Sequence, residues 1–321
     1  MIHPQFTKTR HIQVSVDTSG YCQARCELCI WPELKSLKRV MTDEEFEVCF
    51  ERLSGFTFEE FALNSINEPF VDRRILNKFE RLIRSGAKIR NLFFSSNWLL
   101  PDISEIQRFV ELSGECAQQA SIDWLSVNAT VSGIDEQSYD ILQAGSRLEN
   151  VNMPYRKLSF EQARANIILL ARGLSTVVPA KSKIRLNIKA YGDVFTAEEF
   201  SDYWLQTLSA EGINPDFLRF NSKITLNHSF QTFGRSDQTD QPQLARKCSS
   251  GWLDRQIVVG PDGRVGLCCV EGAHKVVVGN IYTQTLDEII ASSSYQRWLR
   301  IALGLDPEDV PAPCRNCEFF V

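Results

Sequence analysis

Three cysteines near the start of the chain have a spacing that suits metal chemistry. Cys22, Cys26 and Cys29 form a C-x3-C-x2-C pattern. Three thiolates this close on one loop can ligate three irons of a cubane 4Fe-4S cluster, whereas structural clusters take four cysteines. The fourth iron then keeps an open coordination site, which favours chemistry at that iron. A partial zinc site and three cysteines without a common role are the alternatives.

A second group of cysteines lies near the other end of the chain. Four thiolates can close a 4Fe-4S cluster completely, and they can also close a tetrahedral zinc site. Ligand count alone does not separate these two metals. Cys269 adjoins Cys268, and adjacent residues of a strand point to opposite faces, so one of the two belongs to the site. The four expected ligands are Cys248, Cys268, Cys314 and Cys317.

Composition narrows the class of protein. The chain has 321 residues, 43% hydrophobic and 23% charged, which is typical of a globular protein with one large and one small domain. A formal net charge of -5 argues against a nucleic-acid-binding surface. The first residues contain no charged-then-apolar targeting segment, and no apolar run is long enough to span a bilayer. We therefore expect a soluble, cytoplasmic protein, whose ten cysteines serve metal or redox chemistry rather than disulfides.

Strand and helix patterns alternate along the first two thirds of the chain. Six strands are expected, each followed by a helix, and capping residues mark several helix starts. Cys49 and Cys116 fall on apolar helix faces and are expected to be ordinary buried cysteines. The expected strands are 12–17, 60–65, 90–95, 122–128, 149–152 and 183–189, and the helices are 72–85 and those that begin at Thr42, Ser104, Asp135, Ser159 and Thr196.

Regular alternation of this kind implies a parallel sheet with helical crossovers. Six units are two fewer than a closed barrel needs, so the expected fold is α/β, an open, partial (β/α)6 barrel. The C-terminal part differs, because a hairpin over 257–269 and one helix over about 286–302 are expected there. The expected domains are a core over 1–221, a polar linker over 222–246 and a small α+β extension over 247–321.

In such barrels the site lies where the strands end, and the cysteine loop leaves the first strand at that edge. Polar residues at or beside the later strands are therefore candidates to bind a ligand. A glutamate there can accept hydrogen bonds from an ammonium group. The candidates are Asn67 and Glu68 after the second strand, Ser96 after the third, Ser126 and Asn128 on the fourth, and Arg185 on the sixth.

The C-x3-C-x2-C motif that follows the first strand resembles the cluster-binding motif of the radical SAM superfamily. Members of that superfamily bind S-adenosylmethionine (AdoMet) at the open iron. The family has a Gly-Gly-Glu-like motif after the second strand that holds the methionine amino group. Here Asn67-Glu68-Pro69 matches the glutamate and the proline but not the glycines. Ser126 and Asn128 match positions that contact the ribose or carboxylate. Leu28 replaces the aromatic residue often found beside adenine, which leaves a backbone contact.

The C-terminal pattern, C-x14-G-x4-C followed by a distant C-x2-C, resembles the twitch extension, a truncated form of the SPASM domain. This resemblance implies one auxiliary 4Fe-4S cluster rather than zinc, and it selects Cys268 over Cys269 as a ligand. The implied cofactors are thus two 4Fe-4S clusters and AdoMet. An external electron donor of the flavodoxin or ferredoxin type is also implied.

The resemblance further implies that the enzyme makes a 5′-deoxyadenosyl radical, which abstracts a hydrogen atom from a substrate. Members with such extensions modify ribosomal peptide precursors, or aminocyclitols, sugars and nucleosides. Because the first strand begins near residue 12, no N-terminal peptide-binding domain is expected, which favours a small substrate or a peptide brought by a separate delivery protein. Natural-product peptide maturation is the favoured function. An aminocyclitol, sugar or nucleoside dehydrogenase or epimerase is the second, and a non-catalytic iron-sulfur or zinc module the third.

Overall fold

The structure is a computed structural model. It describes residues 1–24, 26, 38–144, 159–177, 183–191, 194–214, 217–223, 247–249, 254–266, 268, 276–306, 310 and 314.

The described strands form a single sheet in the order β6-β5-β4-β3-β2-β1-β7-β8-β9. Strands β1 to β6 are parallel to their neighbours, β7 also joins β1 in parallel, and β8 and β9 are antiparallel. The predicted α/β class with a parallel sheet is therefore confirmed. The strands are β1 His11–Val16, β2 Thr57–Ala62, β3 Ile89–Ser96, β4 Ile122–Thr130, β5 Ile184–Tyr191, β6 Leu218–Lys223, β7 Gln256–Val259, β8 Arg264–Gly266 and β9 Gly279–Asn280.

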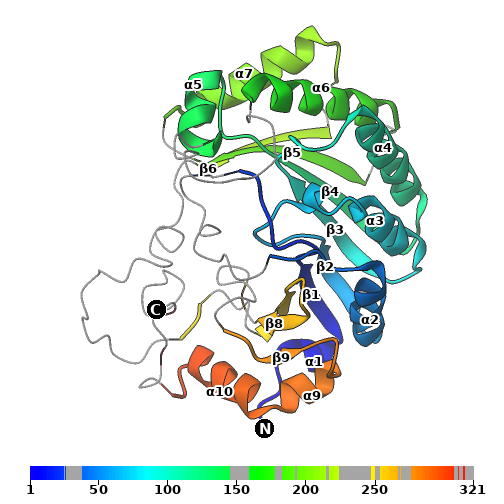
Figure 1. Ribbon diagram of the computed structural model, residues 1–321, viewed down its shortest axis with the longest axis vertical. Coiled ribbons are helices and arrows are strands. Elements are labelled where there is room, and N and C mark those ends of the chain that lie inside the picture. Colours follow the sequence, from blue (N-terminus) through cyan, green and yellow to red (C-terminus); the bar gives the residue numbers. More distant parts are fainter. Residues whose placement is uncertain are drawn as a thin grey trace.

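The sheet curves, and a row of helices lies along its outer side (Figure 1). Helices α2, α3, α4, α6 and α7 form this row, while α9 and α10 lie near the N-terminal helix α1 at the other end of the molecule. The helices are α1 Gln5–Thr9, α2 Asp43–Leu53, the 3-10 turn η2 Pro69–Val71, α3 Ile75–Arg84, α4 Ile103–Gln118, α5 Glu136–Tyr139, the π-helical turn η3 Asp140–Ala144, α6 Phe160–Val177, α7 Ala197–Ala210, α9 Leu286–Ala291 and α10 Ser293–Ala302.

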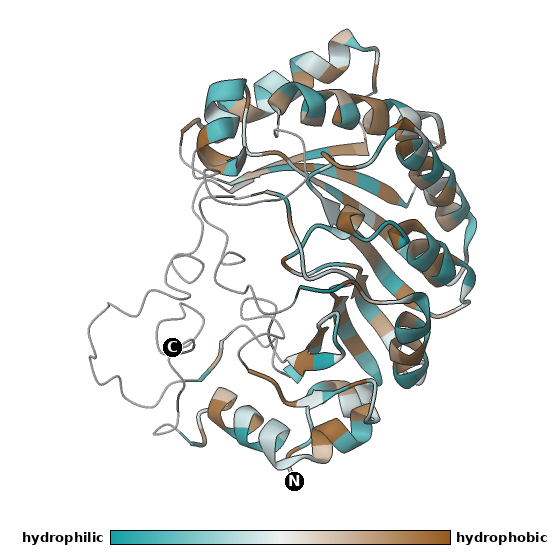
Figure 2. Cartoon of the chain, viewed as in Figure 1, coloured by the Kyte–Doolittle hydropathy of each residue, from teal (hydrophilic) through white to brown (hydrophobic). Residues whose placement is uncertain are grey.

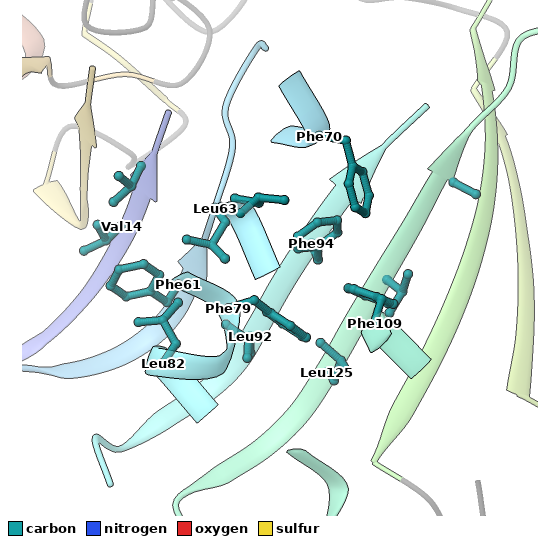
Figure 3. Packing of buried hydrophobic residues seen from close by; sticks show 14 of the residues in the cluster. Val14, Phe61, Leu63, Phe70, Phe79, Leu82, Leu92, Phe94, Phe109 and Leu125 are labelled. Atoms are coloured by element: carbon teal, nitrogen blue, oxygen red, sulfur yellow. The ribbon is translucent and has the colours of Figure 1, made fainter. Parts of the chain in front are cut away.

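Apolar side chains fill the space between the sheet and these helices. Successive strand residues point to opposite faces, and the face of β3 toward the helices carries the buried residues Leu92 and Phe94. The Phe94 ring lies 4.8 Å from that of Phe109 on α4, which in turn stacks on Phe79 of α3 at 5.1 Å between centroids. Figure 3 shows this aromatic contact between layers, and Figure 2 shows apolar residues on the sheet-facing sides of the helices. The core therefore fixes β3 and β4 firmly against α3 and α4.

The opposite, inner face of the sheet is polar. Its side chains include those of Glu60 on β2, Asn91 on β3 and Ser126 on β4. A hydrogen-bond chain joins them, because Ser126 Oγ donates to Asn91 Oδ1 (2.7 Å) and Asn91 Nδ2 donates to Glu60 Oε2 (2.8 Å). Helices therefore cover one face of this parallel sheet, while the other face carries polar groups.

Two expectations about the core sheet need correction. The strand expected at 149–152 lies outside the described residues, and β4 pairs directly with β5. The sixth parallel strand is instead β6, which sequence analysis missed and which continues past the expected core boundary at residue 221. The last two of its six residues fall within the polar run 222–246 that is expected to be a linker, so the strand pattern is short and merges with that run. In the described part of the chain the edge strands β6 and β9 do not pair with each other.

The C-terminal part joins the core more closely than expected. The expected hairpin exists as β7 and β8, but β7 also pairs with β1 and thus continues the core sheet. The single helix expected over 286–302 is two helices, because Ser292 is extended (φ -64°, ψ 148°) and caps α10 through its side chain. Thr285 and Glu288 form a capping box that begins α9.

Several local predictions are confirmed. Capping boxes start α2 at Thr42 and α7 at Thr196. Cys49 and Cys116 are buried in the core, and burial raises the pKa of each thiol to about 12. Within the described ranges, no helix combines the length and hydropathy that a membrane span requires.

Candidate functional site

Three loops meet where β1, β2 and β3 end. The loop after β1 carries the first cysteines, and its Tyr21 carbonyl accepts a hydrogen bond from the backbone N–H of Glu68 (3.1 Å). Two residues later, Gln23 Nε2 donates to Asn97 Oδ1 (2.8 Å) on the loop after β3. The cysteine loop is thus held against both neighbouring loops at the carboxyl edge of the sheet, where the sequence predicted the site.

Glu68 is the best anchored acidic residue at this edge. Its Oε1 accepts hydrogen bonds from Ser96 Oγ (2.7 Å) and the N–H of Phe70 (3.1 Å), and its Oε2 accepts one from the N–H of Asn97 (2.9 Å). The side chain is buried, and burial raises its pKa to about 7 although these hydrogen bonds lower it. A buried carboxylate fixed in this way suits a cationic group, which would stabilise its charged form.

Trp98 connects the ends of β3 and β4 through a strained backbone. It has a positive φ of 56°, which is uncommon for a residue with a large side chain. Its N–H donates to Ser96 Oγ (2.9 Å), and its indole Nε1 donates to the Asn128 carbonyl (3.1 Å). The Asn166 side chain of α6 donates to the Trp98 carbonyl (2.7 Å). These contacts fix Ser96 beside Glu68, and no local sequence pattern predicts them.

The predicted residues of β4 lie at two depths on the inner face. Asn128 is buried near the end of the strand, and its Oδ1 accepts a hydrogen bond from Asn187 Nδ2 (2.8 Å) on β5. Within the described part of the chain, its Nδ2 has no partner. Ser126 lies two residues deeper, where its hydroxyl is engaged by Asn91. Asn128 is therefore the better placed of the two to meet a ligand at the carboxyl edge.

The expectation that Arg185 lies at the carboxyl edge of the sheet is wrong. Arg185 is the second residue of β5, so it lies at the amino end of the strand. It is exposed, and its guanidinium lies 4.1 Å from the centroid of the Trp124 ring. The sequence pattern located the strand, but the position of Arg185 near the amino end of that strand was not taken into account.

Sequence analysis missed two buried residues near the site. Asp17 ends the inner-face row of β1, and its Oδ1 accepts hydrogen bonds from the N–H groups of Ser65 (2.7 Å) and Ile66 (3.3 Å). Tyr139 of α5 is fully buried and adjoins the π-helical turn. Burial raises the pKa of Tyr139 above its ordinary value, and the nearby Cys26 and Cys22 raise it further. Neither residue belongs to a spacing motif that a single sequence reveals.

Buried polar atoms without a partner gather at this edge. Each such atom in a protein interior costs free energy unless a ligand or water satisfies it. Their concentration where β1, β2 and β4 end fits a polar ligand such as AdoMet. Among the described residues they are Thr18 Oγ1, Ser65 Oγ, Asn128 Nδ2 and the Tyr139 hydroxyl, together with Asp17 Oδ2 and both amide atoms of Asn67, which lie near each other without reaching hydrogen-bond geometry.

The cysteine predictions are described only in part. Cys22 and Cys26 are half-buried against the core at the site edge, while Leu28 and Cys29 lie outside the described residues. Cys248 is joined to the end of α10, because its N–H donates to the Ala302 carbonyl (2.8 Å). Cys268 and Cys314 are described, but Cys317 is not. Within the described ranges, no three His, Cys, Asp or Glu side chains are grouped to hold a metal ion.

Comparison with known families gives an independent result for the C-terminal part. Residues 248–318 match SPASM, an iron-sulfur cluster-binding domain. This match spans all four cysteines predicted for the second site. A comparison with curated proteins finds no match.

Solved structures with the same fold cover nearly the whole chain. BtrN in complex with AdoMet and 2-DOIA has 13% identity and a TM-score of 0.55 over 96% of this chain and 93% of that chain. Native anSMEcpe with bound AdoMet has 15% identity and a TM-score of 0.58 over 95% and 86%. SuiB of Streptococcus suis bound to precursor peptide SuiA has 11% identity and a TM-score of 0.55 over 98% and 72%. The resemblance of the C-terminal cysteine pattern to a SPASM-type extension is therefore confirmed, and the solved structures share the fold of this chain.

Proposed function

We propose that this chain, which carries a SPASM iron-sulfur cluster-binding domain, is a radical SAM enzyme. The observation that carries the proposal is the joining of the cysteine loop to the buried Glu68 through the Tyr21 carbonyl, at the sheet edge where unpartnered polar atoms collect. Two similar structures were solved with AdoMet bound, which supports that ligand.

Each group at the edge has a part in this proposal. Cys22, Cys26 and Cys29 hold a 4Fe-4S cluster through three irons. Glu68 accepts hydrogen bonds from the AdoMet amino group, and Asn67 and Asn128 offer amide donors and acceptors to the rest of the molecule. Leu28 contributes a backbone contact, and Ser96 orients Glu68. With one electron from a flavodoxin or ferredoxin, bound AdoMet supplies methionine and a 5′-deoxyadenosyl radical that takes a hydrogen atom from the substrate.

The second site holds one auxiliary 4Fe-4S cluster on Cys248, Cys268, Cys314 and Cys317. Four protein ligands leave no open iron, so its role in the proposal is electron transfer. A cluster held there would accept one electron from the substrate radical, which would thereby be oxidised, or would relay electrons from the external donor. The match to an iron-sulfur cluster-binding domain supports iron over zinc at these cysteines.

The proposed substrate is a ribosomal peptide precursor in natural-product maturation. SuiB, with the same fold, was solved with its precursor peptide, and anSMEcpe with the Cp18Cys peptide. An aminocyclitol, sugar or nucleoside substrate is the second candidate, because BtrN was solved with 2-DOIA and matches this chain over 93% of its own length.

An anaerobic assay tests the reaction class. The reconstituted chain, reduced with dithionite and given AdoMet, should release 5′-deoxyadenosine, which liquid chromatography with mass spectrometry detects. The variant with Cys22, Cys26 and Cys29 all changed to Ala should release none. Cys116→Ala, which removes a cysteine from the core rather than from the site, is the matched control and should stay active. Absence of 5′-deoxyadenosine from a protein with full iron content would overturn the proposed function.

The substrate class is tested separately. A precursor peptide encoded beside the gene should raise the release of 5′-deoxyadenosine above the uncoupled rate and should itself change mass. A matched peptide deuterated at the modified carbon should transfer deuterium to 5′-deoxyadenosine. Stimulation by a neighbouring sugar-pathway intermediate instead of the peptide would favour the second candidate.

A further inference from the structure

Asp17 joins three segments that are far apart in the sequence. Its side chain accepts hydrogen bonds from the N–H groups of Ser65 (2.7 Å) and Ile66 (3.3 Å), which immediately precede the Asn67-Glu68 pair. Its own N–H donates to the Val259 carbonyl at the end of β7 (2.8 Å). One residue therefore connects the strand before the cysteine loop, the loop that carries Glu68, and the strand that begins the C-terminal hairpin.

Burial of the Asp17 carboxylate costs free energy. The residue is completely buried, and among the described residues its second oxygen, Oδ2, reaches no partner in hydrogen-bond geometry. The neighbouring Asn67 side chain is also buried. It lies near the Asp17 carboxylate and lowers its pKa, but within the described part of the chain its two polar atoms reach no partner in hydrogen-bond geometry. A position with only a packing role would favour an apolar residue, because an unsatisfied buried polar group is unfavourable. The cost is understandable if a bound ligand completes this group.

We propose that Asp17 is a positioning residue for AdoMet. Its carboxylate fixes the Ser65–Asn67 segment so that Glu68 is presented at the sheet edge, and its charge adds to that of Glu68 to favour a cationic ligand. This inference rests on the proposed function, since AdoMet carries both an ammonium and a sulfonium group. It adds to that function a residue that lies outside the cysteine and glutamate motifs.

The electrostatics of the site agree with this role. Burial raises the pKa of Asp17 to about 6, although the amide groups of the Ser65–Asn67 segment lower it, and burial raises that of Glu68 to about 7. A bound cation stabilises the charged form of each carboxylate, so binding tightens as either one loses its proton. The other titratable groups brought to this edge are Cys22, Cys26 and Tyr139.

The test measures AdoMet binding by isothermal titration calorimetry to the anaerobically reconstituted full chain. Asp17→Asn keeps an oxygen that accepts from the Ser65 and Ile66 N–H groups but removes the charge. Loss of one charge-assisted interaction should weaken binding about tenfold. Asp17→Ala also removes the acceptor and should weaken it further. Asp123→Asn removes one exposed acidic charge at the opposite end of the sheet and should bind as the wild type does.

A pH series separates positioning from a general structural effect. Wild-type affinity should rise with pH through about 6 and about 7 and then level off, as Asp17 and Glu68 deprotonate in turn. Asp17→Asn should lose the lower part of this rise and keep the upper part. A variant that was merely less stable would keep both parts.

The outcomes distinguish this inference from the proposed function. If the wild-type chain, with its full iron content, does not bind AdoMet, the proposed function fails. If the wild type binds but Asp17→Asn has the same affinity and the same pH profile, the positioning role is overturned. Loss of cluster iron from Asp17→Asn would also overturn it, because the residue would then act on the cluster. Asp17→Asn carries the test if Asp17→Ala does not fold.

Discussion

The Glu68 carboxylate accepts a hydrogen bond from the Ser96 hydroxyl across 2.7 Å, from the end of the neighbouring strand. The same hydroxyl accepts a hydrogen bond from the N–H of Trp98, so the Ser96 proton is directed at Glu68. The acidic group of the candidate site is therefore oriented before any ligand arrives. Preorganisation of this kind reduces the entropy that binding must overcome.

Replacing Glu68 should weaken AdoMet binding. Glu68→Ala removes charge-assisted hydrogen bonds to the ligand, each worth about 1.5–3 kcal/mol. Binding to the reconstituted protein, measured by equilibrium dialysis, should fall by about tenfold or more. Glu111→Ala, on α4 and away from the sheet edge, serves as the control. Unchanged affinity in Glu68→Ala would mean that Glu68 only caps the turn that follows it.

Glu68 should lower the stability of the ligand-free chain at neutral pH, although it strengthens AdoMet binding. Glu68 has a pKa of about 7 in the folded chain against 4.5 in the unfolded chain, so the folded state holds the extra proton between these values. The free energy of unfolding of the ligand-free chain should fall as pH rises from 4.5 to 7, by about 3 kcal/mol from this group. Glu68→Gln should flatten that part of the curve and be more stable than the wild type at pH 7.5. Urea unfolding at pH 5 and pH 7.5 measures both, and equal slopes in the two proteins would contradict the expected cost of burial.

Iron content should report two separate clusters. The reconstituted chain should hold about eight irons and eight sulfides. Changing Cys22, Cys26 and Cys29 together to Ala should leave about half of each. Zinc at the C-terminal cysteines, measured by elemental analysis, would contradict the auxiliary-cluster assignment.

The adjacent cysteines Cys268 and Cys269 should behave differently. Cys268→Ala should lose or destabilise the auxiliary cluster, about four irons, whereas Cys269→Ala should keep it. Parallel iron counts on the two variants make the comparison. The reverse result would mean that a bulge near Gly266 shifts the strand by one residue. Full iron in both variants would mean that neither thiol is an essential ligand.

A buried ion pair behind the site should be essential for stability. Lys78 Nζ lies 2.8 Å from Asp72 Oδ2, and both side chains are almost wholly buried. Lys78→Met leaves the buried Asp72 charge with only the more distant guanidinium of Arg74 (4.0 Å), which should cost about 3–5 kcal/mol of unfolding free energy. Lys88→Met, on the exposed surface, should change it by less than about 0.5 kcal/mol. Equal unfolding midpoints for these two variants would show that Asp72 finds another partner.

Local patterns predicted much of the fold and half of the site. Capping residues such as Thr42 and Thr196 and the periodic apolar residues of β3 and β4 located most elements, because these signals act within a few residues. Glu68 was found through its place after a strand. Asp17 was not, because its hydrogen bonds reach a loop 48 residues away. Tyr139 lies on a four-residue helix followed by a π-helical turn, to which the 3.6-residue period does not apply.

The parallel pairing of β1 with β7 has a consequence for folding during synthesis, because β1 is made long before its neighbour. Val14 and Ile257 are register partners, yet a ribosome must add more than two hundred residues between them. Until β7 emerges, β1 exposes one row of unpaired backbone groups, a template for pairing with other chains. Ile2 likewise acquires its hydrogen-bond partner late in synthesis, because its N–H donates to Gln296 Oε1 of α10 (2.7 Å). In a nascent chain, β1 therefore remains without this neighbour until β7 has been synthesised. A stop codon before residue 256 removes β7 and should yield aggregates rather than a working N-terminal barrel.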